Sequence, residues 1–404
     1  MTNDRPVRRT GSAYDLPPPA YDETLVTVAK GTPAGELLRR YWHPVALSAE
    51  IKDLPMQVRA LGEDLILFRT REGKIGAVHP RCAHRGTSLF YGKVEERGIR
   101  CCYHGWLFDT EGRCLEQPCE PQGGTKRENY RQPWYPAEER YGLVFAYLGP
   151  LEKKPPLPRY DTLETLGEDH FIVASGDSIG SGGPERMPCN WFQTHENVMD
   201  PFHVFVLHST FSTKQFNEMM AVPPEIYFGT SAHGCYSVQL RKFDDGTMLR
   251  RITEIVLPNI RIVADPFVRS FGKGNSVAWA LPIDETNTRI FTVFAWPKSE
   301  PVPARFNRNP MYGGKTWYEL DAEGHQRMPG DFEAQVSQGP ITFHSEEQLA
   351  TSDRGVALYR KLFRQAVRDV QEGRDPPNTR QGSEIVIKVE AGNYLMPQAA
   401  LAGE

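Results

Sequence analysis

Cys82-Ala83-His84 and Cys101-Cys102-Tyr103-His104 are two short motifs, sixteen residues apart, that each offer thiolate and imidazole ligands to a metal. Two Cys and two His can bind one structural zinc ion, or they can hold a [2Fe-2S] cluster with both His on one iron. The first alternative is a binding module without redox activity, and the second is an electron carrier. The two motifs leave both alternatives open, so the rest of the chain has to decide between them.

Length and composition are those of an ordinary globular protein. The chain has 404 residues, 39% hydrophobic and 24% charged, which is typical of two or three domains. Its formal net charge of −4 argues against nucleic-acid binding. No apolar run approaches the roughly 20 residues that cross a bilayer, and no signal region is visible at the N-terminus. Seven scattered cysteines favour a reducing compartment, so we expect a cytoplasmic protein that does not enter the membrane.

The first part of the chain is expected to be a tail followed by a β domain. Residues 1–30 form the tail, because the first 25 residues are polar and proline-rich. Thr32, followed by proline, is a typical helix start. Over 31–155 the pattern predicts a small antiparallel β domain, and a charged, proline-rich linker follows at 151–159. The strands of this domain are expected at 64–69, 74–78 and 142–147.

The second part, residues 156–404, predicts an α+β domain with an antiparallel sheet. Strands are expected at 251–257 and 289–296. An amphipathic helix is expected after Ser352. Its apolar face comprises Val356, Tyr359, Leu362, Phe363, Ala366, Val367 and Val370. Its polar face comprises Arg360, Lys361, Arg364 and Arg368.

A second group of possible metal ligands lies at Asp200, His203 and His208. Asp200 with Pro201 after it predicts a helix start. The two histidines are five residues apart, about 140° around an α-helix, so the turn between them should loosen, end or become π-like. Two imidazoles plus one carboxylate are typical of non-haem Fe(II) oxygenases. Two buried, hydrogen-bonded histidines are the alternative, and the separate Cys/His motifs favour the iron site.

With both sites in view, the chain resembles the large subunits of Rieske non-haem iron oxygenases, within their phthalate dioxygenase-like group. The resemblance runs from about Gly31 to Asp353. It rests on the stretches at 37–44, 82–89, 101–106, 196–203 and 338–341. It implies a small Rieske domain followed by a helix-grip-like α+β catalytic domain that holds a mononuclear iron.

The resemblance implies two ligand sets. Cys82, His84, Cys101 and His104 would hold the [2Fe-2S] cluster, and Cys102 would be a loop residue. His203, His208 and Asp331 would hold the mononuclear Fe(II). The residues alone would equally allow Glu333 or Asp353 as the carboxylate. The family tends to carry Asp-Arg-Ser after the position of Ile341, where this chain has Phe343-His344-Ser345, and we expect His344 to be a surface or interface residue.

The family also implies partners and a reaction. Its members form head-to-tail homotrimers, in which an electron would pass from His84 or His104 through Asp200 of the neighbouring subunit to His203. The sequence has no dinucleotide-binding fingerprint, because the glycines at 180–183 lack the strand–turn–helix context. A separate NAD(P)H-linked reductase with flavin and iron–sulfur centres is therefore expected. The reaction would be O2-dependent hydroxylation of an aromatic, carboxylated substrate, with oxidative O- or N-demethylation as the alternative.

The substrate pocket is expected among apolar strands of the second domain. A planar guanidinium suits a carboxylate, so Arg250, Arg251 or Arg261 is a candidate anchor. The pocket is expected to draw on some of Ile252, Ile255, Leu257, Ile260, Phe291 and Val293, with the remainder in the core.

Overall fold

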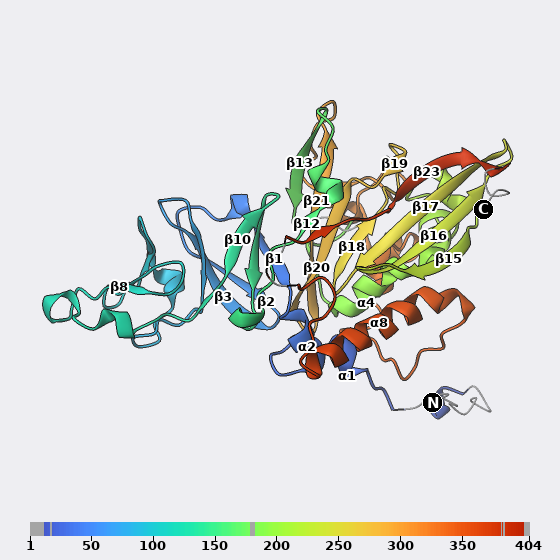
Figure 1. The fold of residues 1–404 in the computed structure, drawn as a ribbon. Helices are drawn as coiled ribbons and strands as arrows, with labels where there is room; N and C mark the ends of the chain where they lie inside the picture. Colours follow the sequence, from blue (N-terminus) through green and yellow to red (C-terminus); the bar gives the residue numbers. More distant parts are fainter. Residues whose placement is uncertain (1–11, 17, 178–181, 381, 383, 400–404) are drawn as a thin grey trace.

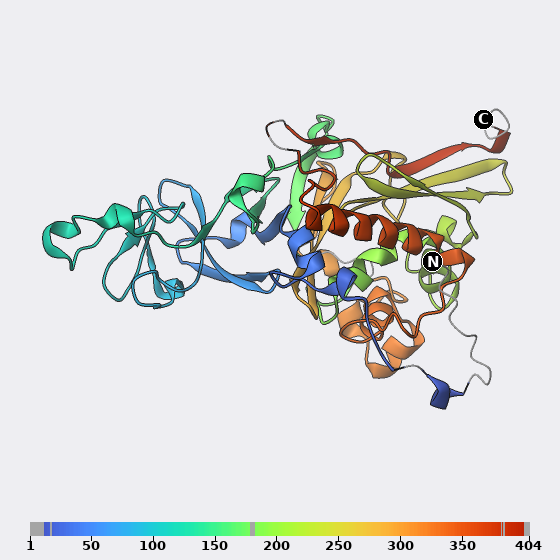
Figure 2. The ribbon, with the colours of Figure 1, turned by 60° about the horizontal axis from the view of Figure 1, so that its bottom comes forward.

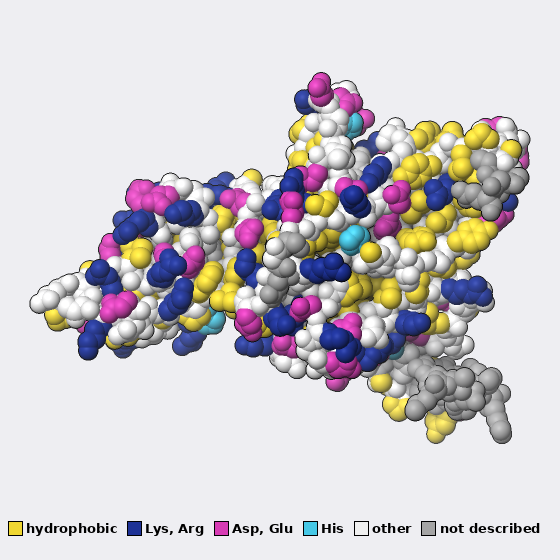
Figure 3. All heavy atoms as spheres, in the orientation of Figure 1, with side chains coloured by type: hydrophobic (Ala, Val, Ile, Leu, Met, Phe, Trp, Pro, Cys, Tyr) yellow, Lys and Arg dark blue, Asp and Glu magenta, His cyan; other side chains and the backbone are white. Residues whose placement is uncertain are grey.

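The computed structural model describes residues 12–16, 18–177, 182–380, 382 and 384–399. Part of the glycine cluster at 180–183 lies outside these residues. A narrow β domain projects from one side of a larger domain built around a long, curled sheet (Figure 1). Acidic and basic side chains are interspersed over the face shown in Figure 3. No helix in the described ranges is long and apolar enough to span a bilayer.

The projecting domain consists of three small antiparallel sheets. The first contains β1 (Trp42–Leu47), β11 (Leu143–Tyr147) and β10 (Ala137–Arg140). The second contains β2 (Met56–Ala60), β3 (Glu63–Arg69), β4 (Ile75–Val78) and β9 (Trp134–Tyr135). The third contains β5 (Lys93–Val94), β6 (Ile99–Arg100), β7 (Leu107–Phe108) and β8 (Cys114–Glu116). The strands predicted at 64–69, 74–78 and 142–147 are confirmed.

The larger domain contains a ten-stranded antiparallel sheet. Its main path is β13 (His170–Ser175), β21 (Asn287–Pro297), β20 (Ser276–Asp284), β18 (Ile260–Val263), β17 (Thr247–Val256), β16 (Gly234–Lys242) and β15 (Glu225–Thr230). The short strands that pair off this path are β14 (Arg186–Met187), β19 (Gly272–Lys273) and β23 (Gly392–Pro397). A separate parallel pair joins β12 (Arg159–Tyr160) to β22 (Val386–Ile387). Both strands predicted for this domain are confirmed.

Helices pack beside the large sheet (Figure 2). They are α1 (Glu23–Val26), α2 (Pro33–Leu38), α3 (Asp161–Glu164), α4 (Trp191–Glu196), α5 (Pro201–Phe205), α6 (Ala322–Arg327), α7 (Asp331–Val336) and α8 (Arg354–Gln371). As predicted, Thr32 caps α2 and accepts a hydrogen bond from the backbone N–H of Gly35. The predicted tail is too long, because Asp22 caps α1 and Leu25 and Val26 are buried in the core.

The predicted amphipathic helix is α8, and one residue of its expected polar face is wrong. Tyr359 and Phe363 pack into the core, as the helical spacing predicts. Arg360 is also buried, and it forms ion pairs with Glu196 at 2.7 Å and Glu347 at 2.5 Å. Two carboxylates from outside the helix compensate this buried guanidinium, which the period of the helix cannot show.

The domains share one core, and the projecting domain has a second core of its own. Phe145 of β11 meets Trp279 of β20 edge to face, with ring centroids 5.5 Å apart. The second core lies beneath the Cys/His loops and includes Phe68, Phe108 and Trp106. The Cys/His loops therefore rest on their own packed base, while the domain behind them is fixed to the large sheet.

Candidate metal centres

The two Cys/His loops fold into matching turns. The N–H of Gly86 donates to the carbonyl of Cys82 at 2.8 Å, and the N–H of Gly105 donates to the carbonyl of Cys101 at 3.1 Å. Both glycines have positive φ, 76° and 73°, which favours glycine. The correspondence pairs Cys101, not Cys102, with Cys82.

These turns bring the four predicted cluster ligands together. The Cys82 and Cys101 thiols are buried and influence each other electrostatically, and the rings of His84 and His104 have centroids 4.6 Å apart. Burial raises the pKa of the Cys82 thiol to about 11, so its thiolate form needs a cation beside it. Two thiols and two imidazoles at one tip fit a [2Fe-2S] cluster of the Rieske type.

Several residues around the tip lie close to the predicted ligands but are not ligands themselves. Trp106 is buried and stacks on His84 with a centroid distance of 4.5 Å and an interplanar angle of 4°. The Arg85 guanidinium lies over the Tyr103 ring. Cys102 is exposed. Trp106 therefore fixes the plane of one imidazole from the protein side.

The second candidate centre lies along α5 and the π-helical turn that follows it. The Asp200 carboxylate accepts a hydrogen bond from the N–H of Phe202, and Pro201 is the first helical residue, as predicted. The turn at Val206–Thr210 is π-helical, which confirms the departure expected from the five-residue spacing. This wider turn lets His203 and His208 point to the same side.

Asp331, the first residue of α7, completes a triad with these histidines. The ligand atoms of His203, His208 and Asp331 all lie within 4.8 Å of one another. Asp331 Oδ1 is 3.2 Å from His208 Nε2 and 3.8 Å from His203 Nε2. This donor set fits the facial arrangement of non-haem iron sites.

A residue that the sequence did not indicate orients His208. Gln215 Oε1 accepts a hydrogen bond from His208 Nδ1 at 2.8 Å, and Gln215 Nε2 donates to the carbonyl of Pro329 at 2.8 Å. The Pro329 carbonyl fixes the direction of the amide, so Nδ1 carries the proton and Nε2 is free to bind metal. The Nδ1 of His203 likewise donates to the carbonyl of Asp200. No periodic pattern marks Gln215, because it lies in an irregular segment.

The charges of the triad are mutually compensating. Burial alone would raise the pKa of Asp331, but the His208 and His203 rings and Arg261 hold it well below its usual range. Burial opposes protonation of His208, yet Asp331 outweighs it and raises the pKa of that imidazole. The pocket thus favours an ionised carboxylate beside positive charge, which is also what a divalent cation would supply.

The competing ligands suggested by the sequence lie elsewhere. Glu333 accepts hydrogen bonds from Trp317 Nε1 and from the N–H of Gly330. Asp353 accepts a hydrogen bond from the N–H of Ala350. His344 was expected at the surface or at an interface, and the surface alternative is wrong, because His344 is buried and its Nδ1 accepts a hydrogen bond from the N–H of Asp22. The N-terminal segment covers it.

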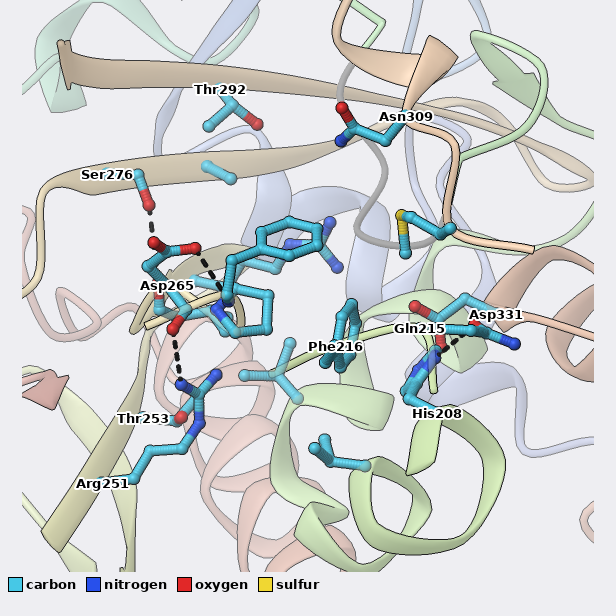
Figure 4. Close-up of a pocket in the computed structure, with 18 of the residues that line it drawn as sticks. His208, Gln215, Phe216, Arg251, Thr253, Asp265, Ser276, Thr292, Asn309 and Asp331 are labelled. Carbon is cyan, nitrogen blue, oxygen red and sulfur yellow. Dashed lines mark hydrogen bonds and ion pairs between the residues drawn. The ribbon is translucent and has the colours of Figure 1, made fainter. Parts of the chain in front are cut away.

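A cavity of about 570 Å³ opens beside the triad. In Figure 4, His208 and Asp331 lie at one side, Arg251, Thr253 and Asp265 lie at the other, and Phe216 stands between them. The lining of the cavity also includes Asn197, Asp200, Arg261, Arg269, Ala278 and Phe294. A cavity of this size accommodates a small aromatic molecule.

The apolar residues predicted to line the pocket do not do so. Five of the six, all except Ile252, belong to the main hydrophobic core, and Ile252 is buried away from the cavity lining. Arg250 also lies outside the lining, whereas Arg251 and Arg261 belong to it. On β21 the cavity meets Thr292 and Phe294, the residues that alternate with the predicted Phe291 and Val293. Strand periodicity gives two faces but does not say which one meets a cavity.

Comparisons with known proteins agree with a Rieske-type cluster domain and with the fold. A Rieske [2Fe-2S] domain profile matches residues 41–136. The chain is 49% identical to phenoxybenzoate dioxygenase subunit alpha of Ectopseudomonas oleovorans, over 96% of this chain and 95% of that protein. It is 31% identical to the 5,5'-dehydrodivanillate O-demethylase oxygenase subunit of Sphingobium, over 93% of this chain and 85% of that protein. The crystal structure of dicamba monooxygenase bound to dicamba aligns with a TM-score of 0.58 at 16% identity, covering 83% of this chain and 99% of that chain, and so shows the fold.

A Rieske [2Fe-2S] domain joined to a catalytic domain with a His-His-Asp triad defines an oxygenase component. The chain belongs to the Rieske non-haem iron oxygenases, as an alpha subunit of the aromatic-ring type. The zinc-binding module considered from the sequence is thereby set aside.

Proposed function

We propose that this subunit binds a mononuclear Fe(II) through His203, His208 and Asp331 and hydroxylates an aromatic carboxylic acid with O2. The observation that carries the proposal is the triad itself, which presents three protein ligands among the described residues and faces the cavity. The [2Fe-2S] cluster is assigned to Cys82, His84, Cys101 and His104. When bound, the cluster supplies electrons and the Fe(II), with open coordination positions, activates O2.

The residues of the chain prepare the site for this chemistry. Gln215 and the carbonyl of Asp200 hold the Nδ1 protons, which aims each Nε2 at the triad. His208 is fully buried, and Phe216 packs on its ring with centroids 4.2 Å apart. This packing keeps water from one side of the triad, so that the substrate approaches from the cavity.

The substrate class rests on the cations of the cavity and on a relative. Arg251, Arg261 and Arg269 contribute to its lining, and guanidinium groups suit carboxylates. The relative that shares 49% of its residues is named for phenoxybenzoate. We therefore propose an aromatic acid of one or two rings as the substrate.

Oxidative O-demethylation is the second candidate, and the similarity to the 5,5'-dehydrodivanillate enzyme favours it. Both reactions would use the same triad. Oxygen uptake by the subunit with its electron donors, measured over phenoxybenzoates, benzoates and methoxybenzoates, tests the proposal. Ring hydroxylation and formaldehyde release separate the two candidates, and an absence of uptake with every acid would overturn the substrate class.

We propose that electrons cross between subunits of a homotrimer. Asp200 caps α5, lines the cavity and lies 3.7 Å from His203 Nδ1 through its Oδ2. In the proposed trimer it would connect His203 with a cluster histidine, His84 or His104, of a neighbouring copy. The Asp200→Asn variant should retain both metals and lose most turnover. A variant that turns over at the wild-type rate would contradict the bridging role.

The electron source is proposed to be a separate NAD(P)H-linked reductase, because the sequence has no dinucleotide fingerprint. The names of both relatives, a subunit alpha and an oxygenase subunit, support a multicomponent system. None of the seven cysteines, which all lie in the described part of the chain, forms a disulfide, and this supports a cytoplasmic location. We propose 31–155 and 156–404 as the two domains, preceded by an N-terminal segment whose end, from Leu25, packs into the main core.

A further inference from the structure

One cation of the cavity lining, Arg261 of β18, has no hydrogen bond or ion pair with any described residue, and the charge that acts on it is that of Asp331. Its side chain is half-buried and forms part of the cavity wall. Its nitrogen atoms are not among the enclosed, unpartnered ones of the described chain. The guanidinium donors of Arg261 are therefore free to bind a molecule that enters the cavity.

The other cations of the lining already have partners. Arg251 donates three hydrogen bonds, two of them to backbone carbonyls. Arg269 forms an ion pair with Asp265 at 2.9 Å, and Lys214 has an acidic partner at 3.3 Å. Among the described residues of the lining, Arg261 is thus the cation without a protein partner.

The groups around Arg261 do not supply a counter-charge of its own. The carboxylate of Asp331 belongs to the triad, 3.2 Å from His208 Nε2, and an Fe(II) bound there would take up its charge. His195 of α4 is fully buried, and burial together with Arg261 keeps the pKa of that imidazole well below its usual range, so it is neutral. A desolvated cation is unfavourable without an anion, so this part of the cavity favours an anionic ligand.

The strand register places Arg261 in the part of the cavity floor that lies toward the triad. Arg261 pairs with Ala278, and Ala278 pairs with Thr292, so the three side chains form one row across β18, β20 and β21. Val263, two residues beyond Arg261, pairs with Thr253, which lies on the side of the cavity away from the triad (Figure 4). The row of Arg261 is therefore nearer to the triad than the row that follows it.

The rows beyond Arg261 carry an aromatic wall. Phe294 lies two residues beyond Thr292 on β21, about 7 Å further along the strand, and stacks on Phe306 with ring centroids 4.7 Å apart. Trp296, two residues further on, meets Phe306 edge to face at 5.5 Å. All three aromatic side chains line the cavity. The cavity thus combines a free cation near the triad with an apolar surface beyond it.

We propose that Arg261 binds the carboxylate of the aromatic acid, and that the apolar remainder of the substrate lies along Phe294, Phe306 and Trp296. The planar guanidinium would donate two parallel hydrogen bonds to the carboxylate oxygens. This arrangement places the carboxylate-bearing ring beside the triad and a second ring, where the acid has one, against the aromatic wall. The inference rests on the proposed function, and it assigns the residue that distinguishes an acid from a neutral arene.

Calorimetric titration of the iron-loaded protein, without electron donors so that no turnover occurs, tests the assignment. The probes are 3-phenoxybenzoate and its uncharged amide, and the wild type should bind the acid more tightly. Arg261→Gln should bind the acid at least about 30-fold more weakly and the amide equally well, and Arg261→Lys should recover part of the loss. Arg250→Gln is the matched control and should bind both probes as the wild type does, because Arg250 lies outside the lining.

Three results would overturn the assignment. The wild type could bind the acid and the amide equally, a comparison that needs no variant to fold. Arg261→Gln could retain the preference for the acid. Arg269→Gln could lose as much affinity for the acid as Arg261→Gln, which would indicate the summed positive charge of the cavity and not one binding residue. Failure of the proposed function has a different signature, since the wild type with its electron donors would then show no oxygen uptake with any aromatic acid.

Discussion

The two candidate metal centres of this chain contrast in location and in construction. The four Cys/His residues of the cluster site fall within 23 positions, on two matching turns at the tip of the projecting domain, and His84 and His104 remain partly exposed. The triad joins residues 123 positions apart, and His208 is fully buried. A centre that receives electrons needs an accessible ligand, whereas a centre that activates O2 needs a closed pocket around the substrate.

The largest expected effect comes from replacing a ligand of one centre, which should leave the other centre intact. Asp331→Asn should lose the mononuclear iron and reduce turnover by more than about 100-fold, because a direct ligand matters more than its outer partners. Its visible spectrum should remain that of an intact [2Fe-2S] cluster. Cys101→Ser should instead lose the cluster spectrum. Iron analysis together with absorption spectra checks both variants, and loss of the cluster from Asp331→Asn would show that the centres are not independent.

The next largest effect concerns the hydrogen bond from His208 to Gln215, which orients one member of the triad. Gln215→Leu removes the acceptor for His208 Nδ1, so we expect iron affinity and turnover to fall by about 10–100-fold. Gln215→Glu retains an acceptor and is the matched control. Iron titration of the metal-free protein measures the change, and an unaltered affinity in Gln215→Leu would refute the orienting role.

The same contrast explains what the sequence could predict. The paired Cys/His motifs, the helix start at Asp200 and an irregular turn before His208 are local, so spacing indicated them, whereas the resemblance was needed to favour a cluster over zinc and Cys101 over Cys102. Asp331 was indicated by the resemblance and not by spacing, since Glu333 fitted equally well. Gln215 was missed because it lies in an irregular segment where no periodicity applies.

Long-range packing accounts for the remaining errors. Arg360 was placed on the polar face because its partners, Glu196 and Glu347, come from other parts of the chain. The prediction of an apolar pocket lining was wrong because period-two patterns do not distinguish the face of a strand that packs in the core from the face that meets a cavity. The fold class needed only element types and order, which is why it was predicted correctly from the sequence.

A smaller effect tests the matching turns of the cluster site. A Cβ on Gly105 would meet Pro118 Cγ at 2.6 Å, whereas one on Gly86 would meet the flexible end of Arg81, with Nη2 at 2.8 Å. Both glycines have positive φ, so each alanine variant should cost about 1–2 kcal/mol, and Gly105→Ala should cost more. Thermal bleaching of the cluster absorbance compares them, and equal losses would show that the backbone conformation alone matters.

The smallest expected effect is that of Cys102→Ser. Cys102 is exposed and lies one position beyond the residue whose carbonyl accepts from Gly105, so its thiol should contribute no ligand. We expect the absorption spectrum, the iron content and the turnover to equal those of wild type, in contrast to Cys101→Ser. If Cys102→Ser lost the cluster and Cys101→Ser kept it, the pairing of the two turns would be shifted by one residue. The turn geometry argues against that shift, because Cys82 and Cys101 both lie four positions before a glycine of positive φ.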